Sequence, residues 1–170
     1  TAYAAHYPGA HAITLNPRFF GKPKVFKEQV SLDVRIGWHP PGTDSPAAIF
    51  THEYGHAIQT WLNNPSRAFN PVVAEGGTGM FSDLFYKWER ANIRRGKLVS
   101  SYAASNPRVE AWTESFTALM HAPRSTWTEY TLAQERLLRE ITSLPIYREW
   151  QYSYMLTQEE RAILYPELLA

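Results

Sequence analysis

Residues 52–56 read His-Glu-Tyr-Gly-His, which is an H-E-x-x-H pattern. On a helix, side chains four residues apart lie on one face, so the imidazoles of His52 and His56 can reach one metal ion. Glu53 then lies beside that ion, where its carboxylate can act as general base on a water that the metal activates. The pattern predicts a zinc-dependent hydrolase, with the peptide bond as the first candidate for the bond that is cleaved.

A helix over residues 46–63 is expected to carry this pattern. Ser45 and Pro46 have the residue types of an N-cap and a first helical position, and Asn63-Asn64-Pro65 ends the helix. The intervening residues are apolar on nearly every side, which predicts a position inside the domain. Two histidines and a glutamate are costly to bury unless they are paired or coordinated, and a metal ion satisfies all three together.

A third ligand is expected because a catalytic zinc site normally has three protein ligands and a water. Glu110 and Glu114 lie one turn apart on a helix predicted from about residue 107 to 120. One of them can ligate the ion while the other holds a ligating histidine by its second ring nitrogen. The alternative is a pair of solvated glutamates on an exposed face. A helical wheel places both opposite a group of apolar residues: Val109, Trp112, Phe116, Leu119 and Met120.

Glu75 competes for the role of third ligand. It follows His56 by 19 residues, a spacing similar to that of thermolysin-like enzymes. Those enzymes hold this glutamate within a helix, whereas three of the four residues after Glu75 are glycines, which disfavour a helix. Four further histidines are possible ligands, although each alone is more typical of a surface or a core position: His6, His11, His39 and His121.

The composition limits the classes of function. The chain has 170 residues, which fits a single domain spanning 1–170, and its formal net charge of +1 gives no basic surplus for nucleic acid. It has no cysteine, so a metal must be held by histidine and carboxylate. We find no signal peptide and no membrane-spanning stretch. A start at Thr1 is consistent with a processed product or with one domain of a longer protein.

The order of the expected elements predicts an α+β fold with a small, mostly N-terminal sheet and a helical C-terminal half. Strands are expected over residues 12–15 and 30–36, the second because apolar and polar residues alternate in it. Loops are expected over 37–42 and 71–79. Besides the helices named above, others are expected over three ranges: 80–94, 129–142 and 158–164. The aromatic residues after 145 are expected to pack on the core or to form an interaction surface.

Residues 101–116, SYAASNPRVEAWTESF, followed by Leu119-Met120-His121, resemble the catalytic domain of anthrax lethal factor and its relatives. These relatives include the secreted proline-proline endopeptidases, and zincin-like domains encoded by bacteriophages are also similar. The resemblance implies a zincin fold with Zn²⁺ and the following roles. The metal ligands are His52, His56 and Glu110, the general base is Glu53, the tyrosine that assists the transition state is Tyr102, and Glu114 supports the ligands.

The resemblance also implies a peptide or protein substrate, and a place in a virion or among secreted toxin-like proteases. Other subunits of a larger assembly are then partners, while nucleic acid and membrane are not expected. By analogy with zincins, residues 30–36 are expected either to pair with an extended substrate as an edge strand or to be an ordinary core strand. One alternative function is a catalytically silent zincin-fold domain with a structural or interaction role in a phage particle or toxin. Another is hydrolysis of a different amide bond, for example in a cell-wall peptide.

Overall fold

The computed structural model describes residues 2–7, 12–63, 80–94 and 97–143. This part of the chain is mostly helical and has one small antiparallel sheet at its N-terminal end, which is compatible with the α+β class. The elements in chain order are β1 (Ala4–Tyr7), β2 (Ala12–Leu15), α1 (Pro17–Phe20), α2 (Pro23–Arg35), α3 (Pro46–Asn63), α5 (Met80–Ile93), α6 (Ser101–Ser105), α7 (Pro107–His121) and α8 (Glu129–Ser143).

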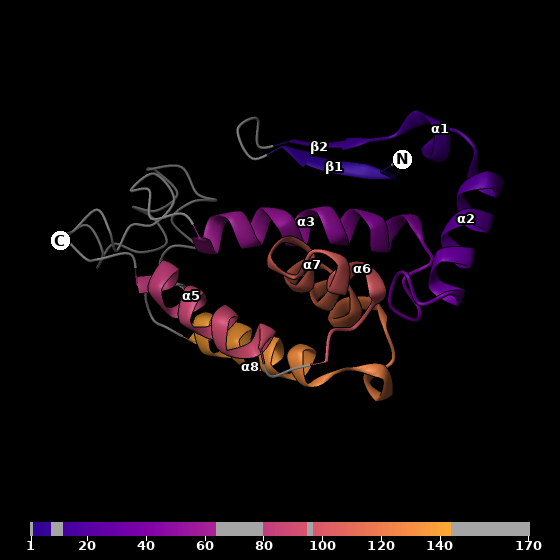
Figure 1. Cartoon of the computed structure of the whole chain (residues 1–170). Helices are drawn as coiled ribbons and strands as arrows, with labels where there is room; N and C mark the ends of the chain where they lie inside the picture. Colours follow the sequence, from indigo (N-terminus) through magenta and orange to yellow (C-terminus); the bar gives the residue numbers. More distant parts are fainter. Residues whose placement is uncertain (1, 8–11, 64–79, 95–96, 144–170) are drawn as a thin grey trace, which may run out of the picture.

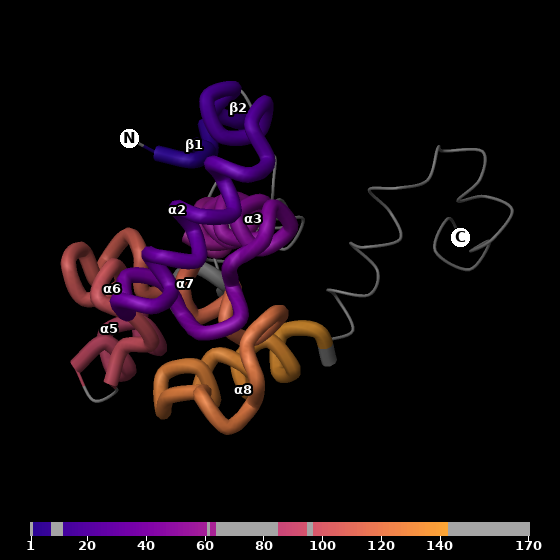
Figure 2. The backbone as a smooth tube through the Cα atoms, turned by 90° about the vertical axis from the view of Figure 1, so that its right-hand side faces the viewer, coloured from indigo at the N-terminus to yellow at the C-terminus, as the bar shows by residue number. Residues whose placement is uncertain are grey.

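Helix α3 runs through the middle of the molecule (Figure 1). The sheet lies on one side of it, with Ala4 paired to Leu15 and Tyr7 to Ala12, and α7 crosses it on the other side. Figure 2 shows α3 end-on, between the two strands and α8. Because α7 also packs against α5, α6 and α8, every residue from Glu110 to Ala118 is buried. The described helices include none that is long and apolar enough to cross a membrane.

Two apolar clusters fix α3 in this position. The first joins α3 to α5, α7 and α8, and the second joins it to β1, α1 and α2. The buried members of the first are Leu62, Phe85, Trp112, Leu137 and Ile141. Those of the second are Ala4, Phe19, Phe26, Val30 and Ile49. Burial of the Leu, Ile, Val and Phe side chains among them contributes about 1.5–3 kcal/mol each, so the two clusters hold the neighbouring elements against α3.

The predicted strand over residues 30–36 is wrong, because Val30 to Arg35 belong to helix α2. Pro23 occupies the first turn, and Phe26 and Val30, one helical turn apart, are buried against the second cluster. Leu32 and Ile36 are 44% and 64% exposed, so the alternating pattern does not mark a buried face. Residues 30–36 are therefore neither a core strand nor an edge strand for a substrate.

Three further elements of the structure have no counterpart in the sequence predictions, and the others agree. The strand over 12–15 and the helices over 46–63, 80–94, 107–120 and 129–142 are confirmed to within a residue at each end, and residues 37–42 form a loop. Strand β1 and the short helices α1 and α6 were not predicted. The expected loop over 71–79, the helix over 158–164 and the aromatic C-terminal segment lie outside the described residues.

Candidate metal centre

Two helices bring His52, His56 and Glu110 together. The Oε2 atom of Glu110 lies 3.3 Å from His52 Nε2 and 3.5 Å from His56 Nε2. One ligand atom from each residue lies within 4.8 Å of the other two, an arrangement that can hold a metal ion. We call these residues the His52–His56–Glu110 cluster; they join α3 to the first turn of α7.

The local sequence explains this crossing of α3 and α7. Ser45 caps α3 through its hydroxyl, which accepts from the backbone N–H of Ala48 at 3.1 Å. Gly55, between the two histidines, lets α7 approach closely, because a Cβ added there meets Thr113 Cα at 3.2 Å. With α7 at this distance, a glutamate in its first turn reaches both imidazoles.

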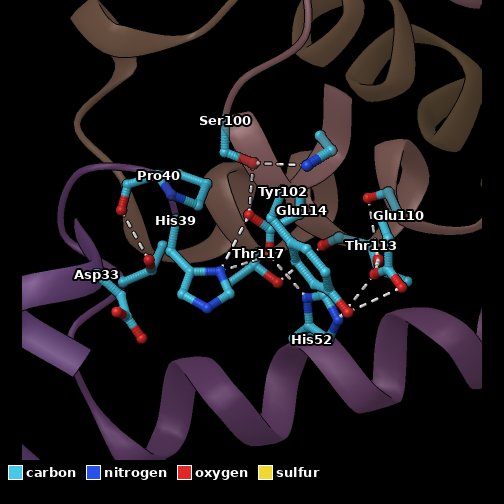
Figure 3. Close-up of polar contacts among 12 residues, drawn as sticks. Asp33, His39, Pro40, His52, Ser100, Tyr102, Glu110, Thr113, Glu114 and Thr117 are labelled. Atoms are coloured by element: carbon cyan, nitrogen blue, oxygen red, sulfur yellow. Dashed lines mark hydrogen bonds and ion pairs between the residues drawn. The ribbon is translucent and has the colours of Figure 1, made fainter. Parts of the chain in front are cut away.

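Glu114, one turn further along α7, lies behind His52 and is only 1% exposed. Its Oε1 atom lies 2.9 Å from His52 Nδ1, an ion-pair contact outside hydrogen-bond geometry. Its Oε2 atom accepts from Ser100 Oγ at 2.6 Å, and His39 Nδ1 lies 3.1 and 3.2 Å from the two oxygens. Figure 3 shows the three side chains converging on this carboxylate. The contacts fix Glu114 and thereby the ring of His52.

The carboxylates and the histidines shift one another's pKa values. Burial alone lowers the pKa of His52, but the contacts with Glu110 and Glu114 outweigh it and raise the pKa to about 10. Burial alone raises the pKa of Glu114, yet His39 and His52 bring it down to about 2. Glu110 shows the same balance, with burial opposed by His52 and His56, and its pKa is lowered. Without metal, the site is thus an ion-paired network with ionised carboxylates.

Tyr102 of α6 stands over the His52–His56–Glu110 cluster. Its hydroxyl donates to Glu110 Oε1 at 3.0 Å, and its ring stacks on that of His52 with centroids 5.9 Å apart (Figure 3). Burial, followed by the negative charge of Glu110, raises the pKa of Tyr102. The hydroxyl therefore stays protonated at neutral pH and remains a hydrogen-bond donor next to the cluster.

Glu53 lies where two cavities meet. One, of about 570 Å³, extends to Asp33 and is called the Asp33 cavity; the other, of about 770 Å³, extends to Arg108 and is called the Arg108 cavity. Both cavities are lined by Ala2, Ala4, His52, Glu53 and Tyr102. Glu53 is only 7% exposed, and it follows His52 directly on α3. A bound molecule that spans both cavities passes this carboxylate.

The other histidines that the sequence offers as ligands, where the structure describes them, do not belong to the His52–His56–Glu110 cluster. His39 is buried and contacts Glu114 rather than the cluster, and His121 Nε2 lies 2.9 Å from Thr51 Oγ1. His6 lines the Arg108 cavity. Glu75 and His11 lie outside the described residues.

The structure corrects the helical wheel of α7. Glu110 and Glu114 do share a side, but both are buried, whereas Val109 and Met120 of the supposed apolar side are 43% and 59% exposed. The interpretation of two solvated glutamates is therefore wrong. The wheel assumes one wet face, and α7 between residues 110 and 118 has none.

Sequence reasoning missed Ser100 and the role of His39. Ser100 is a residue type that favours the N-cap of a helix, which is a signal the sequence contains. In the structure its hydroxyl accepts from the backbone N–H of Ala103 at 3.0 Å as the N-cap of α6. His39 follows a Gly37-Trp38 turn, and no sequence spacing links it to Glu114, 75 residues away.

Comparisons of the chain with protein-family models, curated proteins and solved structures gave no match.

Proposed function

We propose that this protein is a zinc-dependent metalloendopeptidase of the zincin type, which hydrolyses peptide bonds with Glu53 as general base. The observation that carries the proposal is the joint placement of the His52–His56–Glu110 cluster and Glu53 at the meeting point of two cavities. Three protein ligands beside open space are typical of a catalytic metal site, whereas structural zinc sites are closed by four.

The two separations between Glu110 and the histidines support zinc. Ligand atoms 2.0–2.2 Å from a tetrahedral zinc ion lie about 3.3–3.6 Å from one another. Glu110 Oε2 lies 3.3 and 3.5 Å from the Nε2 atoms of the two histidines, within this range. A set of two imidazoles and one carboxylate suits zinc, and the chain has no cysteine to offer a softer site.

Zinc held by His52, His56 and Glu110 would act as a Lewis acid toward a water and the substrate carbonyl. Glu53 would accept a proton from the attacking water and pass it to the nitrogen of the leaving amine. The Tyr102 hydroxyl, a protonated donor next to Glu110, is placed to donate to the carbonyl oxygen as it becomes negative. Glu114 keeps the ring of His52 in its ligating orientation.

The position of β1 supports an extended peptide as the substrate. β2 pairs with one edge of β1, and among the described residues no strand pairs with the other edge. Residues Ala2 to His6 line the two cavities on both sides of Glu53. β1, rather than residues 30–36, is therefore the strand that we propose to pair with the substrate backbone.

Glu53→Gln tests the proposal because it removes the base but leaves the metal ligands. Zinc content, measured by inductively coupled plasma mass spectrometry, should stay at one ion per chain. Cleavage of a peptide library by the same sample should fall by about 10²–10⁴-fold. Glu28→Gln, a matched change at an exposed position on α2, should alter neither quantity.

Two outcomes contradict the proposal. Full peptidase activity in Glu53→Gln removes the general-base role. A wild-type protein that holds zinc but cleaves no peptide supports the catalytically silent domain instead.

A further inference from the structure

The Asp33 cavity is lined by His52 and Glu53 and also by the Asp33 carboxylate, which has only neutral side-chain partners. Asp33 Oδ2 accepts from the Tyr3 hydroxyl, and Oδ1 accepts from Gln29 Nε2 at 3.2 Å. Burial, and then the hydrogen bond to Asp33, raise the pKa of Tyr3, so its hydroxyl remains a donor. Among the residues that the structure describes, no cationic side chain lies within ion-pair distance of Asp33.

This carboxylate has room for further donors. An ionised carboxylate offers about four acceptor positions, and the side-chain contacts of Asp33 take up two. Two hydrogen bonds hold the carboxylate in place, one from Tyr3, which directly precedes β1, and one from Gln29 of α2. Figure 3 shows Asp33 on the side of His39 opposite to Glu110, so the charge of Asp33 is separate from the His52–His56–Glu110 cluster.

The walls between Asp33 and Glu53 suit a long side chain with an apolar stem. The cavity is lined there by aromatic and aliphatic residues, namely Tyr3, Phe19, Val25, Trp38 and Ile49. Trp38 is 39% exposed and its ring lies 5.3 Å from that of Tyr102, which also lines the cavity. The methylenes of lysine and arginine pack on such surfaces, and their charged groups are attracted to aromatic faces.

The charge at Asp33 favours a cation over an anion. His52 and Glu53 carry opposite charges where they line the cavity, whereas the Asp33 carboxylate has only neutral side-chain partners and would repel an anionic side chain. Arg18 also lines it, but this side chain is exposed and its guanidinium lies over the Phe19 ring at 5.8 Å. Arg18 itself illustrates how a guanidinium lies against this aromatic wall.

We infer that the Asp33 cavity is a specificity subsite, in which a lysine or arginine next to the scissile bond pairs with Asp33. The inference rests on the proposed function, because it assigns a side-chain preference to the same cleft. It makes the substrates proteins or peptides with a basic residue beside the cleavage point.

The subsite can be tested without hydrolysis. Zinc-loaded protein is titrated with n-butylguanidinium chloride and, separately, with neutral n-butylurea, and the Trp38 indole N–H signal is followed by NMR. The charged probe should give a saturable shift, with at least about tenfold weaker binding for the neutral one. Asp33→Asn, which can still accept from Tyr3, should abolish the difference, whereas Glu28→Gln on the same helix and the charge-retaining Asp33→Glu should preserve it. Equal binding of both probes to the wild type would contradict the proposed subsite. This comparison uses only the wild-type protein, so it does not depend on the folding of a variant.

Cleavage of a peptide library by the wild type then links the subsite to the reaction. Lysine and arginine should be enriched about tenfold at one position flanking the cut, and Asp33→Asn should lose this enrichment while it still cleaves. Cleavage without a basic preference overturns the subsite and leaves the peptidase. Selective binding of n-butylguanidinium without any cleavage overturns the peptidase function and leaves a cation-binding cavity.

Discussion

The hydroxyl of Tyr102 donates to the same carboxylate that completes the His52–His56–Glu110 cluster. If Tyr102 serves the transition state, its removal should slow the reaction far more than it weakens metal binding. Tyr102→Phe keeps the ring stacked on His52 and lacks only the donor. We expect kcat to fall about 10²–10³-fold, the usual cost of one oxyanion donor. Zinc affinity should change by less than tenfold. An unchanged kcat would reject the role of the hydroxyl.

Glu110 and Glu114 differ by one helical turn and by what they touch. Glu110 contacts both histidines through Nε2, whereas Glu114 contacts His52 through Nδ1 and is held by His39 and Ser100. Glu110→Ala should therefore abolish tight zinc binding, while Glu114→Gln should weaken it about 10–100-fold. Titration against a competing chelator measures both. Ser100→Ala should have a milder effect on zinc affinity, since it removes one hydrogen bond to Glu114 together with the N-cap bond to Ala103. Equal losses for the two glutamate variants would contradict the assignment.

At the level of secondary structure, the sequence predicted the elements whose signals are local. The helix over 46–63 has Ser45 and Pro46 at its start, and its H-E-x-x-H pattern at residues 52–56 indicates a metal site. The prediction for residues 30–36 was wrong because apolar and polar residues alternate there as in a strand. Pro23 and the spacing of Phe26 and Val30 favour the helix that the structure has. β1 could not be predicted, since its four residues AAHY form a strand only through pairing with β2.

The same distinction applies to the site. His52, Glu53 and His56 are readable because five consecutive residues carry them, and Glu110 and Glu114 because they lie one turn apart. Their burial is set by packing of α7 on all sides, which a single-helix wheel does not contain. The His39–Glu114 contact joins residues 75 positions apart, so only the folded chain reveals it.

The crossing of α3 and α7 depends on Gly55. In an uncrowded helix interior, Gly→Ala stabilises by about 1 kcal/mol. A Cβ on residue 55 would meet Thr113 Cα at 3.2 Å, Thr113 Cγ2 at 3.3 Å and Phe116 Cδ1 at 3.4 Å. Because Thr113 Cα belongs to the backbone of a buried helix, it cannot move alone. We expect Gly55→Ala to lower the free energy of unfolding by about 1–3 kcal/mol and to weaken zinc binding by moving Glu110 away. Urea unfolding of the metal-free variant measures the first effect, and a gain in stability would contradict it.

For the molecule as a whole, α3 belongs to both apolar clusters, so the stability of the fold and the geometry of the site share one element. The first cluster fixes α3 against α7, which brings the ligands together. The second fixes it against β1 and α2, which line the Asp33 cavity. A change in either cluster is thus transmitted to the site through the position of one helix.

The charges buried at this junction make the stability of the metal-free protein depend on pH. The pKa of His52 is raised from 6.5 to about 10 in the folded state, so its contribution is fully present below pH 6.5 and is lost as the pH rises through 10. The pKa of Glu114 is lowered from 4.5 to about 2, so its contribution is present above pH 4.5 and is lost as the pH falls through 2. Both contributions are complete only between pH 4.5 and 6.5.

From pH 6.5 upwards, the free energy of unfolding of the chelator-treated protein should fall, by at most about 1.4 kcal/mol per pH unit for the His52 proton. Glu114→Gln removes one of the two carboxylates that hold this proton and should flatten the slope. Zinc requires His52 without the proton, so binding of zinc strengthens as the pH rises and should offset the fall. Urea unfolding at pH 6, 7, 8 and 9, with chelator and with excess zinc, measures both slopes. Parallel pH profiles with and without zinc would mean that zinc does not displace a proton from His52, and the ligand assignment would have to change.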